Sequence, residues 1–315
     1  MNSFFSTKEI ATALGVSQSS IKRWSDSGEL EMIQTSGGHR RISIVSLIQF
    51  LRQTQRLLVE PQVLGLPELD VEESIDYARE RERFQTALIA SDEAAARSIV
   101  LQLYLGMERV SSIGDQLIAP VFAEIGHLWD CGDVEIYEER RCCEICSRIL
   151  RELRSYQPSP ATTAPGAIGA TPVGDLYSLP VALVELVLRE QGWNAVSYGC
   201  QIPLLSLEKI IIQQKPRLVW LSVSFLSDRE QFLQEYASLA ATALNSGTII
   251  AVGGNGLTAD LRRKMDYYMY GDTLQHFERF ASLCFQLQEP SSADSKSSIK
   301  ESDSSSIGFL SRNPS

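Results

Sequence analysis

The chain has 315 residues, which suggests about two domains at ordinary domain size. Hydrophobic residues make up 44% and charged residues 22%, a composition that is typical of soluble globular proteins. No apolar run reaches the ~18 residues of a membrane helix, the first residues lack a signal peptide's apolar stretch, and the six cysteines do not form a disulfide framework, so we expect a cytoplasmic protein without a membrane partner.

Charge is distributed unevenly along the chain. The net charge of −10 argues against a protein that coats nucleic acid along its whole length. Residues 1–58, however, carry seven basic and four acidic side chains, which gives this stretch a net charge of +3. The sequence therefore predicts a small basic module attached to a larger acidic body.

Changes of pattern divide the chain into five segments. A stretch punctuated by Pro and Gly follows the basic module, and a long segment with helical periodicity comes next. Short apolar strand-like runs then alternate with helical ones, and the last residues are mostly Ser and charged. We predict a basic module at 1–58, a linker at 59–70, a helical domain at 71–156, an α/β domain at 164–287 and a disordered tail at 288–315.

The basic module begins with two short helical patterns. The first covers 7–14 with Thr7 as its N-cap, and the second follows Ser17 and stops at Gly28. Two short helices around a Gly-centred turn predict a helix-turn-helix. In the second helix, Ile21 and Trp24 are expected to face the core, which leaves its polar and basic residues exposed.

A hairpin and a closing helix follow. Two strand-like runs flank a Ser-Gly-Gly tip at 36–38, basic residues lie directly beside it, and Ser43 is the expected N-cap of the closing helix. Short polar side chains suit base edges, and cations suit phosphates. The candidate DNA-binding residues are Gln18, Ser19, Ser20, Lys22, Arg23, Gly37, Gly38, His39, Arg40 and Arg41.

The order of these elements resembles a known family. A helix-turn-helix, then T-x-G-G-H-R-R at 35–41, then a further helix is similar to the winged-helix DNA-binding domain of MerR-type transcription regulators. The resemblance covers about 55 residues. It implies that the second helix and the hairpin bind a double-stranded DNA operator, whereas the alternative is a solvated basic helical hairpin without a DNA role.

The segment at 71–156 predicts a four-helix bundle. Helical periodicity covers 74–90, 92–106, 108–130 and 135–156, with Asp92 as the N-cap of the second stretch. The short connections between the stretches are typical of antiparallel neighbours in a bundle. Such a bundle also suits an oligomerisation unit.

The junction of the third and fourth helices resembles the helical cap beside cobalamin-binding domains. The pattern E-I-G-x-x-W-x-x-G contains Trp129, and Glu139 and Arg140 follow ten and eleven residues later. In light-responsive cobalamin-dependent repressors the matching Trp and Glu pack against the adenosyl group, and a His stands at the position of Arg140. The alternative for Trp129 is a core Trp at a helix end.

Three cysteines lie close together in the fourth helix. Cys142 and Cys146 share a helix face, whereas Cys143 points elsewhere. A tetrahedral metal site needs a fourth ligand and usually a loop, and the nearby choices are His127 and Cys131. We therefore favour packed thiols over a metal site.

The segment at 164–287 predicts a doubly wound α/β domain with a parallel sheet, because strand-like and helical runs alternate five times. It resembles a cobalamin-binding domain in its T-P-V-G-D loop at 171–175, in Tyr198-Gly199 with Pro203, and in two small-residue sites. These sites are Ser222 with Ser224, and Gly253 with Gly254. In the family they house the nucleotide tail, because only small residues leave room for it.

The cobalt-binding signature of this family is changed. The family reads D-x-H-x-x-G, whereas this chain has Asp175, then Tyr177 for the His and Pro180 for the Gly. A phenol must lose its proton to compete with a neutral imidazole as a cobalt ligand, and Asp175 has no imidazole to orient. We expect that His-ligated cobalamin binding is lost. The remaining alternatives are cobalamin with no protein ligand on cobalt, or another ligand.

These features favour a DNA-binding transcriptional regulator over an enzyme, and we favour a repressor. Its bundle and α/β domains are expected to control oligomerisation, because a single winged module makes few phosphate contacts and a homo-oligomer makes more. Two alternatives come from other classes. One is a corrinoid carrier for methyl transfer, which needs the absent His. The other is an antagonist that pairs with a related regulator.

Overall fold

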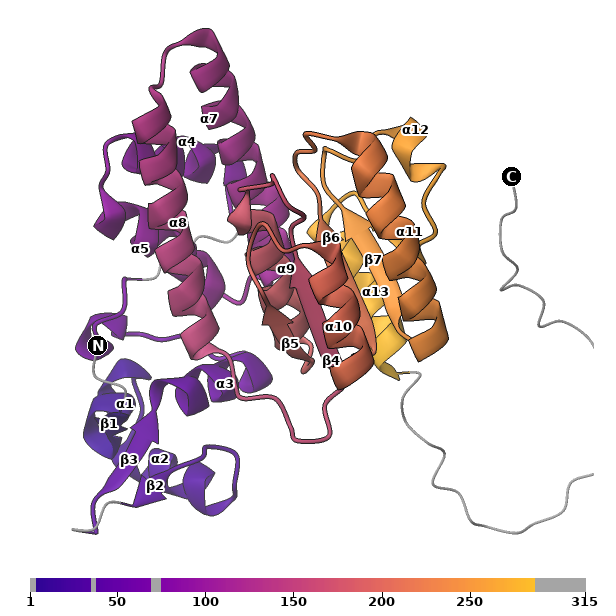
Figure 1. Cartoon of the computed structure of the whole chain (residues 1–315). Coiled ribbons are helices and arrows are strands. Elements are labelled where there is room, and N and C mark those ends of the chain that lie inside the picture. Colours follow the sequence, from indigo (N-terminus) through magenta and orange to yellow (C-terminus); the bar gives the residue numbers. More distant parts are fainter. Residues whose placement is uncertain (1–3, 35–37, 69–74, 287–315) are drawn as a thin grey trace, which may run out of the picture.

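A computed structural model describes residues 4–34, 38–68 and 75–286 of the chain. Three parts follow one another: a small head at residues 4–58, a helical bundle at 75–156 and an α/β part at 166–286 (Figure 1). We call the last two parts together the body. The predicted tail at 288–315, the tip residues 35–37 with the candidate Gly37, and part of the predicted linker lie outside the described residues.

The head is a helix-turn-helix with a small antiparallel sheet. Its strand order is β1-β3-β2, and α3 follows β3 directly. The first strand was not predicted, because three residues are too few to reveal an alternating pattern. The elements are β1 Phe4–Ser6, α1 Thr7–Ala13, α2 Gln18–Asp26, β2 Ile33–Gln34, β3 Arg40–Ser43 and α3 Ile44–Thr54.

Serine hydroxyls cap the N-termini of the helices of the head. Ser17 and Ser43 cap α2 and α3, as predicted. The prediction of Thr7 as the first N-cap is wrong, because Ser6 caps α1 in a capping box with Glu9. The predicted core residues Ile21 and Trp24 are buried.

The chain after α3 packs back on the head. The amides of Val59 and Glu60 donate to the carbonyl oxygen of Ala13, at 2.8 and 3.1 Å. A short 3-10 helix, η1 Pro61–Leu64, follows, and the side chains of Leu64 and Leu66 are buried. The first part of the predicted linker is therefore anchored on α1 by apolar burial.

The bundle contains the predicted helices, but the third is not continuous. It is divided by a π-helical turn at Gly114–Ile118, just before Pro120. Asp115 in that turn accepts hydrogen bonds from the amides of Leu274 and Gln275, at 2.8 and 2.9 Å, and thereby caps a helix of the α/β part. The helices are α4 Tyr77–Ile89, α5 Glu93–Leu105, α6 Val110–Ile113, α7 Ala119–Cys131 and α8 Ile136–Tyr156.

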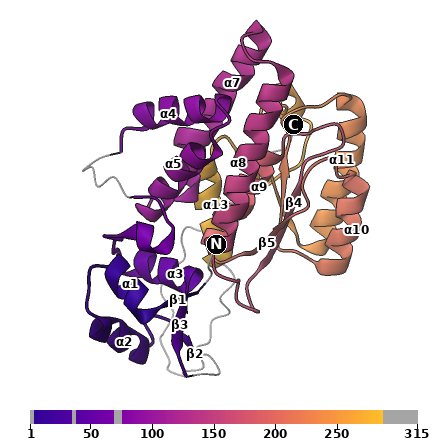
Figure 2. The same ribbon diagram turned by 90° about the vertical axis from the view of Figure 1, so that its left-hand side faces the viewer.

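The α/β part has the five predicted strands in a parallel sheet of order β5-β4-β6-β7-β8. The helices α9 and α13 cover one face of the sheet, and α10 and α11 cover the other (Figure 2). The strands are β4 Gly166–Ala170, β5 Asn194–Ser197, β6 Leu218–Ser222, β7 Ile249–Gly253 and β8 Met269–Gly271. The helices are α9 Ser178–Glu190, α10 Leu204–Gln214, α11 Arg229–Ser246, α12 Ala259–Arg262 and α13 Leu274–Gln286.

The apolar core joins the head to the body. One cluster of buried side chains runs from the head through the bundle to the sheet face under α9 and α13. A second, smaller cluster lies under α10 and α11. Among the described residues, no helix has the length and apolar character needed to cross a membrane.

Candidate functional site

The exposed face of α2 carries the predicted contacts to DNA. Gln18, Ser19, Lys22 and Arg23 are exposed, because Ile21 and Trp24 turn the opposite face toward the core. Ser20 is half-buried, and its hydroxyl lies 3.1 Å from that of Ser17, the N-cap of α2. The outward face of α2 is therefore polar and basic.

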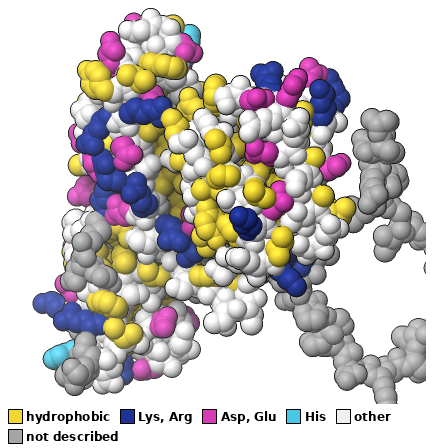
Figure 3. Space-filling model, viewed as in Figure 1, with side chains coloured by type: hydrophobic (Ala, Val, Ile, Leu, Met, Phe, Trp, Pro, Cys, Tyr) yellow, Lys and Arg dark blue, Asp and Glu magenta, His cyan; other side chains and the backbone are white. Residues whose placement is uncertain are grey.

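The hairpin brings further cations next to α2. Gly38, His39 and Arg40 are exposed, and Arg41 is half-buried. Figure 3 shows Lys and Arg side chains and a histidine projecting from the head at the lower left. An Nη1 atom of Arg40 lies 3.3 Å from Oδ1 of Asp26 in the last turn of α2. The hairpin and the second helix therefore form one surface.

Each of the two arginines in β3 has an acidic neighbour within the head. Arg41 lies 3.9 Å from Oε2 of Glu9, and Arg40 pairs with Asp26. The pKa of Glu9 is lowered, first by the donated amide of Ser6, then by the hydroxyl of Ser6, with a smaller effect of Arg41. A phosphate that binds these guanidinium groups must compete with the two carboxylates.

The bundle residues of the predicted cap lie near the α7–α8 junction. Trp129 is 45% exposed, so the alternative of a core Trp is wrong. Glu139 lies 3.4 Å from Nε of Arg140 and accepts a hydrogen bond from Sγ of Cys143 at 3.2 Å. Glu139 and Arg140 are thus paired with each other within α8.

The cysteines of α8 are packed thiols. Cys142 and Cys146 are fully buried on one face, whereas Cys143 is half-buried. Burial raises the pKa of Cys142 to about 11. Within the described residues, no group of three or more His, Cys, Asp or Glu side chains could hold a metal ion.

In the α/β part, Asp175 is fully buried, and both of its carboxylate oxygens accept hydrogen bonds. Its Oδ1 accepts from the amide of Tyr177 at 3.0 Å, and its Oδ2 accepts from the amides of Ser224 and Phe225 at 2.6 and 3.2 Å. With no imidazole to orient, this carboxylate instead accepts charge-assisted hydrogen bonds from backbone donors. Asp175 therefore ties the loop after β4 to the loop after β6.

The other predicted positions of the α/β part surround this loop contact. Tyr177 is 45% exposed and precedes α9 without a side-chain cap. Ser222 is buried beside Gly253, and the carbonyl oxygen of Gly253 accepts from the amide of Val223 at 2.8 Å. The structure thus brings the two small-residue sites together at the carboxyl ends of β6 and β7.

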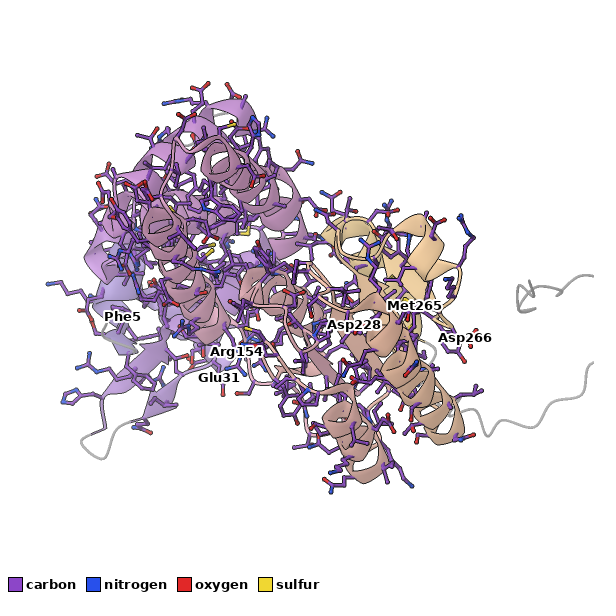
Figure 4. All side chains as sticks on the ribbon, turned by 45° about the horizontal axis from the view of Figure 1, so that its top comes forward. Phe5, Glu31, Arg154, Asp228, Met265 and Asp266 are labelled. Carbon is purple, nitrogen blue, oxygen red and sulfur yellow. The ribbon has the colours of Figure 1, made fainter. Side chains whose placement is uncertain are left out.

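Sequence reasoning missed the contacts between the three parts. Arg52 of α3 donates to the carbonyl oxygens of Tyr104 and Glu108 in the bundle, at 3.0 and 3.2 Å, and to Oε1 of Glu190 in α9, at 2.7 Å. Arg154 at the end of α8, labelled in Figure 4, donates to Oε1 of Glu185 in α9 at 2.7 Å. No sequence pattern marks these pairs, because their partners are far apart along the chain.

The ion pair between Arg52 and Glu190 is largely buried. The side chains of Arg52 and Glu190 are 22% and 16% exposed, and the amide of Val110 also donates to Glu190, at 3.1 Å. Burial raises the pKa of Glu190, and the neighbouring Arg52 opposes this effect. A cavity of about 450 Å³ borders the contact and is lined in part by Arg52, Arg109 and Glu278.

Three family models match the chain. A helix-turn-helix domain matches residues 4–55, and two models that are each described as a B12 binding domain match residues 80–154 and 165–280. The HTH-type transcriptional repressor CarA of Myxococcus xanthus is 23% identical over 265 residues, which cover 81% of this chain and 88% of that protein.

A solved structure has a similar fold. The monomethylamine corrinoid protein of Methanosarcina barkeri aligns with a TM-score of 0.56 at 12% identity, over 66% of this chain and 99% of that chain. At this identity the match shows the fold alone. The sequence relative is a repressor, which favours a regulator over an enzyme. The chain is therefore a DNA-binding regulator that joins a helix-turn-helix domain to two domains of the B12-binding type, and it is similar to the CarA repressor along most of its length.

Proposed function

We propose that this regulator represses transcription by placing α2 in the major groove of an operator and the β3 arginines on its phosphates. The observation that carries the proposal is the ion pair between Arg40 and Asp26, because it places the hairpin cations beside the exposed face of α2. Polar side chains of α2 then read base edges, and Lys22, Arg23, Arg40 and Arg41 neutralise phosphates.

The operator is bound by more than one head. A single module of this size has few cations and makes few phosphate contacts, so specific binding needs a dimer or a larger homo-oligomer that contacts repeated half-sites. The net negative charge of the chain beyond residue 58 supports this arrangement, because it disfavours approach of the body to the duplex and leaves the contact to the heads.

The body controls the head through the Arg52 contact. This side chain belongs to the helix that closes the head, and its acceptors come from both parts of the body. A change in the body that moves Glu190 therefore changes how the head is held. Because Tyr177 stands in place of a His, the body does this without His-ligated cobalamin.

The test is the salt dependence of duplex binding by the full chain. The R40A/R41A double variant is expected to bind more weakly to all sequences, and the slope of log affinity against log salt is expected to fall by about 2. The matched control is K209A/R263A, which removes two cations from the exposed surface of the α/β part. An unchanged slope for R40A/R41A contradicts the assignment of these arginines to phosphates.

A further inference from the structure

On one face of the parallel sheet, small residues lie on the strands to both sides of Trp220, and the larger Leu218, Ile249 and Met269 share this face. Side chains alternate along each strand, so that in-register neighbours share a face. On the face under α9 and α13, Trp220 of β6 stands between Gly169 of β4 and Ala251 of β7. Further small residues on this face are Ala167, Ala195 and Gly253. Such residues leave room between a sheet and its covering helices.

Trp220 fills that room. A Cβ atom built on Gly169 would overlap the indole ring, so the ring lies directly on the backbone of β4. The side chain is only 2% exposed, and its Nε1 donates to the carbonyl oxygen of Val181 in α9 at 3.3 Å. The indole therefore bridges β4 and α9, and a ligand that enters between them must displace it.

The space beside the glycines after β7 is also filled by other parts of the chain. Gly254 has a φ of +108°, and a Cβ atom there would overlap the carbonyl group of Val223. A Cβ atom on Gly256 would lie 3.0 Å from the carbonyl carbon of Ser224. These glycines let the loops after β6 and β7 pack against each other. Asp175 also holds the loop after β6, because its carboxylate accepts from two amides of that loop.

Two cavities of the described residues lie elsewhere. The larger borders Arg52 and Glu190 at the opposite end of α9. The nearer one, between α8 and α9, measures about 170 Å³, whereas drug-sized ligands occupy pockets of about 300–1,000 Å³. Neither cavity is lined by Trp129, Tyr177 or Gly254.

We propose that Trp220 excludes cobalamin from this domain of the B12-binding type, so that the domain serves as a protein-only part of the body. The residues present do not fit the cofactor, because the chain itself occupies the space between β4 and α9, and the loss of the His is only a part of the change. This inference rests on the proposed function, since it states that the body of the regulator does not respond to cobalamin.

The first experiment uses the full wild-type chain. It is incubated with adenosylcobalamin in the dark or with hydroxocobalamin, desalted, and measured at corrin wavelengths. We expect no corrin above the buffer control and no rise in melting temperature, because only a ligand that binds the folded state raises it. Corrin retained in proportion to the protein overturns the proposal. DNA binding by the same sample is measured separately. Failure to bind duplex would count against the proposed function, whereas retained corrin would count against the exclusion of cobalamin.

Variants then separate the indole from the missing His. Y177H/P180G restores the family pattern and is expected to retain no corrin while Trp220 remains. The triple variant Y177H/P180G/W220A is expected to retain it. Corrin bound by the double variant, or none bound by a triple variant that still binds duplex and elutes as the wild type does, contradicts the role of Trp220. W220L, which leaves a smaller gap, replaces W220A in the triple variant if the latter does not fold.

Discussion

Arg40 donates to Asp26, and Arg41 lies near Glu9, so under the proposed function each of these arginines must exchange a carboxylate within the head for a phosphate. Both ion pairs are well exposed, and pairs of this kind contribute little to stability. We expect a more direct effect on DNA binding, because the carboxylate of Asp26 lies beside Arg40 on the surface that we propose binds the duplex.

The variant D26N is expected to bind duplex about 2- to 5-fold more tightly than wild type at low salt, because Arg40 loses a competing negative charge. Fluorescence anisotropy with one labelled duplex measures the affinity. The matched control is E29Q, which removes the same charge from the head but not from an arginine of β3. Equal effects of the two variants would mean that net charge, and not the ion pair, determines the affinity.

Sequence reasoning at the residue scale identified exposed and buried positions better than contacts. It placed Ile21 and Trp24 in the core because helical spacing sets the buried face. It missed Asp26 as the neighbour of Arg40, because that pair is formed only when the hairpin folds back on α2. For the same reason it missed the amides of Ser224 and Phe225 as donors to Asp175, because they lie about 50 residues further along the chain.

At the scale of elements, helix ends in the head depend on side-chain caps. Ser6 accepts from the amide of Glu9 at 3.2 Å, and the carboxylate of Glu9 accepts from the amide of Ser6 at 2.7 Å. This reciprocal capping box begins α1 one residue before the predicted N-cap Thr7. Removal of the hydroxyl at Ser6 and at Thr7 should therefore affect the stability of α1 differently.

The variant S6A is expected to destabilise α1 by about 1 kcal/mol, because the amide of Glu9 loses the hydroxyl oxygen that accepts its hydrogen bond. Amide hydrogen exchange in α1 should be about fivefold faster than in wild type. T7A is the control and should leave exchange almost unchanged, because Ala favours the helix interior. Faster exchange in T7A than in S6A would contradict the position of the cap.

Most elements of the body could be predicted from periodicity alone. The five strands of the parallel sheet follow from short apolar runs between helical ones, since such strands are buried on both faces. The break in the third bundle helix could not be predicted. The π-helical turn at Gly114–Ile118 places Asp115 at the start of α13, which is a tertiary contact without a local sequence signal.

At the scale of the whole molecule, Arg52 connects the three parts. Its guanidinium lies 4.6 Å from the centre of the Tyr104 ring and donates to acceptors in the bundle and in α9. In addition, α3 packs beside α8, so the head is held against the body (Figure 1). Removal of one partner from a largely buried ion pair leaves the other charge without compensation.

The variant R52E is therefore expected to release the head from the body, since it places a second carboxylate beside Glu190. Small-angle scattering should give a larger radius of gyration than for wild type. The control is R56E, because the guanidinium of Arg56 stacks on Trp24 within the head itself. An unchanged radius for R52E would show that other contacts hold the head.

The central claim is that α2 and β3 bind duplex DNA while the body acts without cobalamin. The most direct measurement is a titration of the full chain with duplex across a range of salt concentrations, with and without adenosylcobalamin, in the dark and after illumination. We expect binding that weakens steeply with salt and does not change with cobalamin or light. Failure to bind any duplex at low salt, or an affinity that changes with cobalamin, would contradict it.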